Sequence, residues 1–87
     1  MTRKSKVWHV YIVRCADDTL YTGVAVDVAA RVAQHSAGTG AKYTRARAPV
    51  TLVWSSRARS RSAACKREYA IKQLSRARKE QLVISSK

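Results

Sequence analysis

The chain has 87 residues, with eighteen Lys and Arg against five Asp and Glu, and a formal charge of +13. This length suits one domain over residues 1–87, with a core at about 8–83, and the 46% apolar share excludes a disordered polycation. No apolar run approaches the roughly 20 residues that span a bilayer. The basic start at residues 1–4 is followed by no proper signal segment. We therefore expect a cytoplasmic protein without membrane partners.

The cysteine and histidine content excludes two further classes. Cys15 and Cys65 are the only cysteines, which favours two free thiols in a reducing compartment over a disulfide-stabilised secreted domain. His9 and His35 are the only histidines, and no metal-ligand spacing joins them to the cysteines. A zinc site is therefore not expected.

The positive charge is concentrated in the middle of the chain. No carboxylate lies between Asp27 and Glu68, and that stretch holds Arg31, Lys42, Arg45, Arg47, Arg57, Arg59, Arg61, Lys66 and Arg67. Such a surface attracts polyanions. Anionic lipid would favour one basic amphipathic helix, whereas these charges spread over helices and loops, so nucleic acid is favoured. A solvated surface without a specific partner is the alternative.

The first half of the chain predicts a hairpin and a helix. Residues 7–15 are rich in β-branched and aromatic residues and read as a strand that is apolar on both faces. A turn precedes a second strand at residues 20–25, where Gly23 allows another group to approach closely. Asp27 is an N-cap for a helix over residues 28–35.

The second half predicts a loop, a strand and two helices. Residues 36–49 read as a long loop with one helical turn near Lys42, and loops of this length are usually functional. Residues 50–55 read as a third strand and residues 57–61 as a basic connector. Ser62 is expected to cap a helix running to Leu74, and Ser75 another from Arg76 to about Val83. The order β-β-α-β-α-α predicts an α+β fold with a three-stranded, mostly antiparallel sheet flanked by helices.

Glu68 is the only carboxylate of residues 28–79. On a helix it neighbours Ala64 and Ile71, so it borders the apolar face. A carboxylate in a basic field suits a hard divalent cation at a phosphate site, whereas Lys72 at i+4 suits an ion pair. The pattern leaves the metal ligand and the salt bridge equally open.

Tyr11 and Tyr21 lie on the two hairpin strands, and they share a face if paired residue numbers add to an even value. The turn length leaves this register open. Taken singly, each tyrosine suits a packed core position, His35 a packed or capping histidine, and Arg31 an exposed arginine.

The order of these residues resembles the GIY-YIG nuclease superfamily, in its small single-domain, YhbQ-like bacterial branch. His9-Val10-Tyr11 matches the first motif, and Tyr21-Thr22-Gly23, ten residues later, matches the second. Arg31, His35 and Glu68 match the helix arginine, the residue one turn on, and the metal-binding glutamate. The resemblance extends over about residues 8–83 and rests on the ordered set of motifs.

The resemblance implies an endonuclease that hydrolyses DNA with a divalent metal. Glu68 would hold Mg²⁺ or Mn²⁺, and Arg31 would bind the non-bridging oxygens. Tyr11 or Tyr21, its pKa lowered by neighbouring cations, would take the proton of the attacking water while the other tyrosine positions that water. His35 would support the proton path or bind a phosphate. The residues expected to hold the nucleic acid are Lys42, Tyr43, Arg45, Arg47, Arg57, Arg59 and Arg61.

Two departures from the family pattern keep other functions open. His9 takes the glycine position of the first motif, and residues 75–87 lack an asparagine that some members use. A non-catalytic nucleic-acid-binding module is therefore a second hypothesis, and a small RNA-associated basic protein is a third. A domain this small has little surface for reading duplex sequence, so single-stranded or branched DNA is favoured. No obligate protein partner is evident.

Overall fold

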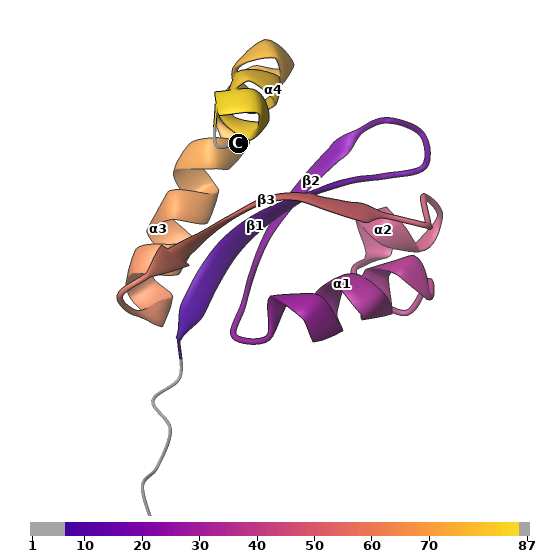
Figure 1. The fold of residues 1–87 in the computed structure, drawn as a ribbon, viewed down its shortest axis with the longest axis horizontal. Helices are drawn as coiled ribbons and strands as arrows, with labels where there is room; N and C mark the ends of the chain where they lie inside the picture. The colour runs from indigo at the N-terminus through magenta and orange to yellow at the C-terminus, as the bar shows by residue number, and fades with distance from the viewer. Residues whose placement is uncertain (1–6, 86–87) are drawn as a thin grey trace, which may run out of the picture.

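A computed structural model describes residues 7–85, so the basic segment at residues 1–4 lies outside the described residues. The elements are β1 (Trp8–Arg14), β2 (Leu20–Ala25), α1 (Val28–Ser36), α2 (Lys42–Arg45), β3 (Thr51–Ala58), α3 (Arg61–Lys72) and α4 (Arg76–Ser85). The strands form one antiparallel sheet in the order β2-β1-β3. Helices α1 and α2 lie on one side of it, and α3 and α4 lie on the other (Figure 1). The predicted α+β fold is confirmed, and α2 is the helical turn expected near Lys42.

The central strand β1 is buried on both faces, as its sequence predicts. Val10 and Ile12 pack with Trp54 in the core under α3 and α4. Tyr11 and Val13 point to the opposite face and pack in the core under α1. These four β1 side chains are at most 1% exposed. The candidate site residue Tyr11 is therefore held on the buried central strand of the sheet.

The hairpin register decides how the two tyrosines lie. Tyr11 pairs with Gly23, and Val13 pairs with Tyr21. Residues opposite each other in an antiparallel pair point to the same face, as do residues two apart on a strand. Tyr11 and Tyr21 therefore share the face that α1 covers.

The sequence misplaces two boundaries around β3. The strand runs to Ala58, because Arg57 and Ala58 pair with the start of β1, so the prediction that the basic connector begins at Arg57 is wrong. The N-cap of α3 is Ser60 and not Ser62: the Ser60 hydroxyl accepts a hydrogen bond from the Ala63 N–H at 3.1 Å. Backbone pairing with β1 extends the strand although the residues here are polar. Only Arg59 and Ser60 then separate the strand from the helix.

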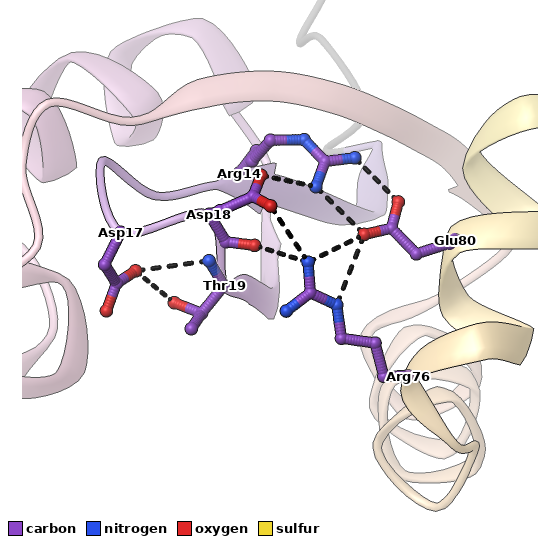
Figure 2. A network of polar contacts seen from close by, with 6 residues as sticks. All are labelled: Arg14, Asp17, Asp18, Thr19, Arg76 and Glu80. Carbon is purple, nitrogen blue, oxygen red and sulfur yellow. Dashed lines mark hydrogen bonds and ion pairs between the residues drawn. The ribbon is translucent and has the colours of Figure 1, made fainter.

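The β1–β2 turn is tied to α4 by charged side chains (Figure 2). Arg14 donates two hydrogen bonds to the Glu80 carboxylate, at 2.7 and 2.9 Å. Arg76 donates to the Asp18 carbonyl at 2.7 Å and pairs with Glu80 at 3.1 Å. The hydrogen bonds from Arg14, helped by Arg76, lower the pKa of Glu80 to about 2. We call Arg14, Asp17, Asp18, Arg76 and Glu80 the hairpin network.

Two further expectations concern the cysteines and the membrane. Cys15 is buried and Cys65 is exposed, and neither forms a disulfide, as predicted. Within residues 7–85, no helix has the length and apolar character needed for a bilayer span.

Candidate active site

Four aromatic rings gather on the α1 side of the sheet, and we call Tyr11, Tyr21, His35 and Tyr43 the ring cluster. The His35 ring meets the Tyr21 ring edge-on, with centroids 5.3 Å apart, and the Tyr21 ring stacks on the Tyr43 ring at 5.7 Å. The Tyr11 ring lies 6.0 Å from the His35 ring. The strands β1 and β2 and the helices α1 and α2 thus contribute one ring each.

His35 is fully buried in the ring cluster. Its Nε2 atom lies 2.9 Å from the Tyr11 hydroxyl, and its Nδ1 atom lies 2.6 Å from Thr44 Oγ1. Burial, and then the positive charge of Arg31, lower the pKa of His35 below its usual value. The imidazole is therefore neutral at pH 7, with both nitrogens engaged in hydrogen bonds.

Two glycines leave the space that these side chains need. A Cβ atom at Gly23 would lie 2.5 Å from the Tyr11 hydroxyl oxygen, so the phenol passes directly over β2. A Cβ atom at Gly40 would collide with His35 Nδ1 and lie 3.0 Å from His35 Cα. The close approach predicted for Gly23 is confirmed, and its partner is Tyr11.

The Tyr11 phenol is influenced by three of the other predicted catalytic residues. Arg31 lowers its pKa, whereas the charges of Tyr21 and Glu68 raise it. Burial is the largest influence and raises the pKa of Tyr11, while Arg31 offsets only part of that rise. The prediction of a lowered pKa is therefore wrong for Tyr11, because removal from water disfavours the phenolate more than one guanidinium favours it.

Glu68 lies beside the ring cluster and is paired with Lys72. The Glu68 side chain is 22% exposed, and its carboxylate lies 3.1 Å from Lys72 Nζ. That ammonium is also 5.8 Å from the centre of the Tyr21 ring. The ion pair predicted as one alternative is thus formed. Within residues 7–85, no three His, Cys, Asp or Glu side chains cluster closely enough to hold a metal ion.

The predicted nucleic-acid-binding residues near α2 are partly occupied. Lys42, Tyr43 and Arg45 lie on α2. Arg47 pairs with Asp17 of the hairpin network at 3.0 Å, and its guanidinium lies 4.0 Å from the centre of the Tyr43 ring. Because Tyr43 already contacts Tyr21 and Arg47, a nucleic-acid base can stack on Tyr43 only if Arg47 moves.

The other predicted arginines lie at the opposite end of the sheet. Arg57 is in β3 opposite His9, and Arg59 is in the connector that follows. Arg61 opens α3, and its guanidinium lies 5.6 Å from the centre of the Trp8 ring. None of the three arginines forms an ion pair with a described residue. Their charges therefore remain available to an anionic partner.

Thr44 is a site residue that the sequence analysis did not single out. It is fully buried and lies against His35. Its place in a polar, glycine-containing loop predicts exposure, and no spacing signal separates it from Thr39 or Thr51. Only the folding of the loop over α1 brings it to the imidazole.

Relatives of this chain are found by comparison with known sequences. Residues 7–81 match the GIY-YIG catalytic domain family. A UPF0213 protein of Natronomonas pharaonis is 60% identical over 75 residues, which cover 86% of this chain and 88% of the relative. A UPF0213 protein of Desulfotalea psychrophila is 58% identical over 80 residues, which cover 91% of this chain and 73% of the relative.

Two solved structures share the fold. The solution NMR structure of a UPF0213 protein of Bacillus halodurans is 47% identical, with a TM-score of 0.57 over 88% of this chain and 82% of that chain. The solution NMR structure of a protein of E. faecalis is 36% identical in sequence, with a TM-score of 0.63. The match covers 97% of this chain and 90% of that chain. Since the family match spans most of the chain and includes both tyrosine motifs, this chain belongs to the GIY-YIG family, the nuclease family that its motifs indicated.

Proposed function

We propose that this chain is a divalent-metal-dependent endonuclease that hydrolyses DNA phosphodiester bonds, with single-stranded or branched DNA favoured. The observation that carries the proposal is the hydrogen bond between the Tyr11 hydroxyl and His35, with Arg31 and Glu68 both acting on the same phenol. Phosphodiester hydrolysis needs a cation for the phosphate oxygens, an acceptor for the water proton and a ligand for a metal ion. These side chains supply all three.

Glu68 would hold the Mg²⁺ or Mn²⁺ ion. Its partly buried carboxylate, completed by water and phosphate oxygens, suits Mg²⁺, which keeps several waters in protein sites. The bound ion would supply Lewis acidity at the leaving oxygen. Glu68 must first release Lys72, and the 47% exposure of the Lys72 side chain lets its ammonium return to water.

Arg31 would bind the non-bridging phosphate oxygens through its guanidinium fork. The Arg31 guanidinium donates to the neutral Gln34 amide at 2.9 Å and forms no ion pair with a carboxylate of residues 7–85. A phosphate that approaches Arg31 also approaches the Tyr11 hydroxyl. Because Tyr11 holds its proton at neutral pH, it accepts a hydrogen from water only as it passes its own proton to His35. Tyr21 would position the attacking water.

The arginines at the β3 end, which form no ion pair within residues 7–85, would hold the nucleic-acid strand. Arg57, Arg59 and Arg61 offer three charges to successive phosphates, and Lys42 and Arg45 offer two more near the ring cluster. Phosphate contacts of this kind carry no base specificity. The proposed preference for single-stranded or branched DNA rests on the small surface available for reading a duplex.

The test is a cleavage assay on single-stranded, duplex and branched DNA, with matching single-stranded RNA, in Mg²⁺, Mn²⁺ or EDTA. We expect metal-dependent DNA products from the wild type. Glu68→Gln should lower cleavage at least about a hundredfold and keep DNA binding in a gel-shift assay. Glu80→Gln, which removes a carboxylate of the hairpin network, is the matched control and should cleave normally. Wild-type cleavage by Glu68→Gln would end the metal assignment.

A non-catalytic nucleic-acid-binding module is the second candidate. The observation that favours it is the Lys72 ammonium paired with Glu68, the residue proposed to hold the metal ion. The same assay separates the two functions: binding that survives EDTA, with no product from any substrate, supports the module. Tighter binding of RNA than of DNA at matched salt would instead support an RNA-associated protein.

A further inference from the structure

The hydrogen bonds around His35 can be satisfied in only one direction. Thr44 Oγ1 lies 3.0 Å from the Ala41 carbonyl and 2.6 Å from His35 Nδ1. A carbonyl can only accept, so the single hydroxyl hydrogen of Thr44 belongs to Ala41. Thr44 must then accept from His35, and Nδ1 must carry the imidazole hydrogen. Nε2 of the neutral ring is left as an acceptor, and the Tyr11 hydroxyl donates to it.

We propose that Thr44 is a positioning residue that fixes His35 in its Nδ1–H tautomer, so that Nε2 receives the Tyr11 proton and the Tyr11 oxygen faces the reacting water. This inference rests on the proposed nuclease function and adds a residue that acts only through His35. The series runs from Tyr11 to His35, Thr44 and the Ala41 carbonyl, with each group donating to the next.

The opposite tautomer leaves a mismatch at both ends of the series. A bare Nδ1 would require the Thr44 hydrogen and leave the Ala41 carbonyl without it. A protonated Nε2 would donate to the Tyr11 oxygen, so the Tyr11 hydrogen would lose His35 as its acceptor. His35 and Thr44 are both fully buried, where unpaired polar groups are most costly.

The local backbone holds these two side chains in place. Gly40 makes room for the His35 ring, and the next residue, Ala41, supplies the carbonyl that orients Thr44. The edge of the Tyr21 ring lies against the same imidazole. The loop before α2 therefore acts as the support for His35.

The proposed step is balanced within these groups and one water molecule. The water O–H bond breaks, and its hydrogen joins the Tyr11 oxygen as the Tyr11 hydrogen joins His35 Nε2. The water oxygen bonds to phosphorus, and the bond from phosphorus to the leaving oxygen breaks. The leaving oxygen takes a proton from solvent, and the His35 imidazolium later returns one to solvent. Phosphate binding to Arg31 favours the transfer, because it offsets the positive charge that opposes protonation of His35.

Ring ¹⁵N chemical shifts of the histidines test the tautomer without any catalytic assay. His9 is the only other histidine, so a His9→Gln sample assigns the His35 signals. We expect the Nδ1–H pattern in the wild type at neutral pH. A wild-type Nε2–H pattern overturns the proposal, and this outcome does not depend on any variant folding or on DNA cleavage.

Variants of Thr44 test the consequence. Thr44→Val removes the hydroxyl at nearly constant volume, and Thr44→Ser keeps it. We expect Thr44→Val to populate the other tautomer and to lower kcat about tenfold to a hundredfold, with KM for DNA within about twofold. Thr44→Ser should restore both properties. The control Thr39→Val alters an exposed threonine of the same loop and should change neither.

The outcomes separate this proposal from the proposed function. A Thr44→Val protein with an unchanged tautomer or undiminished kcat overturns the role of Thr44 and leaves the nuclease assignment intact. A wild type with the expected tautomer that cleaves no DNA overturns the nuclease assignment and, with it, the catalytic role of Thr44.

Discussion

Arginines meet acidic or polar partners in two regions of this molecule, with different results. In the hairpin network, Arg14 and Arg76 share the carboxylates of Glu80 and Asp18 (Figure 2). Beside the ring cluster, Arg31 instead donates to the Gln34 amide and lowers the pKa of the Tyr11 phenol. The first region uses its charges to join the β1–β2 turn to α4. The second leaves a guanidinium without a carboxylate at a buried phenol.

Composition does not separate these regions, because both draw on the same residue types. What separates them is whether the partners of each charge lie within the chain. A fully paired network adds to folding and offers little to a ligand. A cation held next to neutral groups can still bind an anion. We therefore expect the hairpin network to contribute to stability and the ring cluster to contribute to catalysis.

The largest expected difference between the regions is in cleavage. Arg31→Ala should lower the cleavage rate about 10²–10³-fold, as does the loss of other donors that stabilise transition-state charge, while urea unfolding stays close to wild type. Arg14→Ala should lower the urea midpoint, because Glu80 loses its bidentate partner, and should keep the rate per folded molecule. Equal losses of cleavage in both variants would contradict the division of roles.

The second-largest expected effect is a loss of stability when a side chain is added beside the ring cluster. Gly23→Ala places a methyl group against the Tyr11 ring, which is buried and held by His35, so we expect about 1–3 kcal/mol of destabilisation. Gly38→Ala is the control: its φ of +80° adds backbone strain of about 1–2 kcal/mol, but its Cβ meets nothing nearer than 3.9 Å.

Urea unfolding and the His35 ring signals together distinguish the two glycine variants. Gly23→Ala should move the His35 signals, and Gly38→Ala should leave them in place. Unchanged His35 signals in Gly23→Ala would mean that Tyr11 is not confined by β2.

Much of the fold follows from local signals in the sequence. Asp27 and Ser75 cap helices as predicted, since their side chains reach backbone N–H groups three residues on. The apolar residues on both faces of β1 correctly predict a strand that is buried on both sides. Ser62 fails as a cap because Ser60 is the first serine after the β3 pairing, which ends at Ala58. The sequence analysis named only Ser62, because the length of the third strand was underestimated.

The residues of the candidate site could be named from the sequence, whereas their relative placement and their pKa shifts could not. The hairpin register could not be predicted from the turn, where Asp18 has a φ of 70°. Only the structure shows that Tyr11 and Tyr21 lie on the same face of the sheet. The predicted direction of the Tyr11 pKa shift is wrong, because the prediction considered the neighbouring cations and left out the burial that a strand apolar on both faces implies. Thr44 could not be identified from the sequence, because only the tertiary contact between α1 and α2 brings it to His35.

A smaller effect is expected from acid acting on the hairpin network. The pKa of Glu80 is about 2 in the folded protein, against a usual 4.5. Ionised Glu80 therefore stabilises the fold fully above about pH 4.5, and this contribution is lost as the pH falls toward 2. The urea midpoint of the wild type should drop between pH 5 and pH 3, and that of Glu80→Gln should drop less. Parallel curves would show that Arg14 and Arg76 do not hold the Glu80 charge.

The smallest effect compares a paired arginine with an unpaired one. Arg47 is held by Asp17, whereas Arg59 forms no ion pair with a described residue. If Arg59 contacts one phosphate, Arg59→Ala should reduce the slope of log Kd against log salt by about 0.7–0.9. Arg47→Ala should leave that slope nearly unchanged, since its charge is already balanced. Fluorescence anisotropy with labelled DNA measures both. The reverse result would place the strand at the α2 end, and the hairpin network would then share in nucleic-acid binding as well as stability.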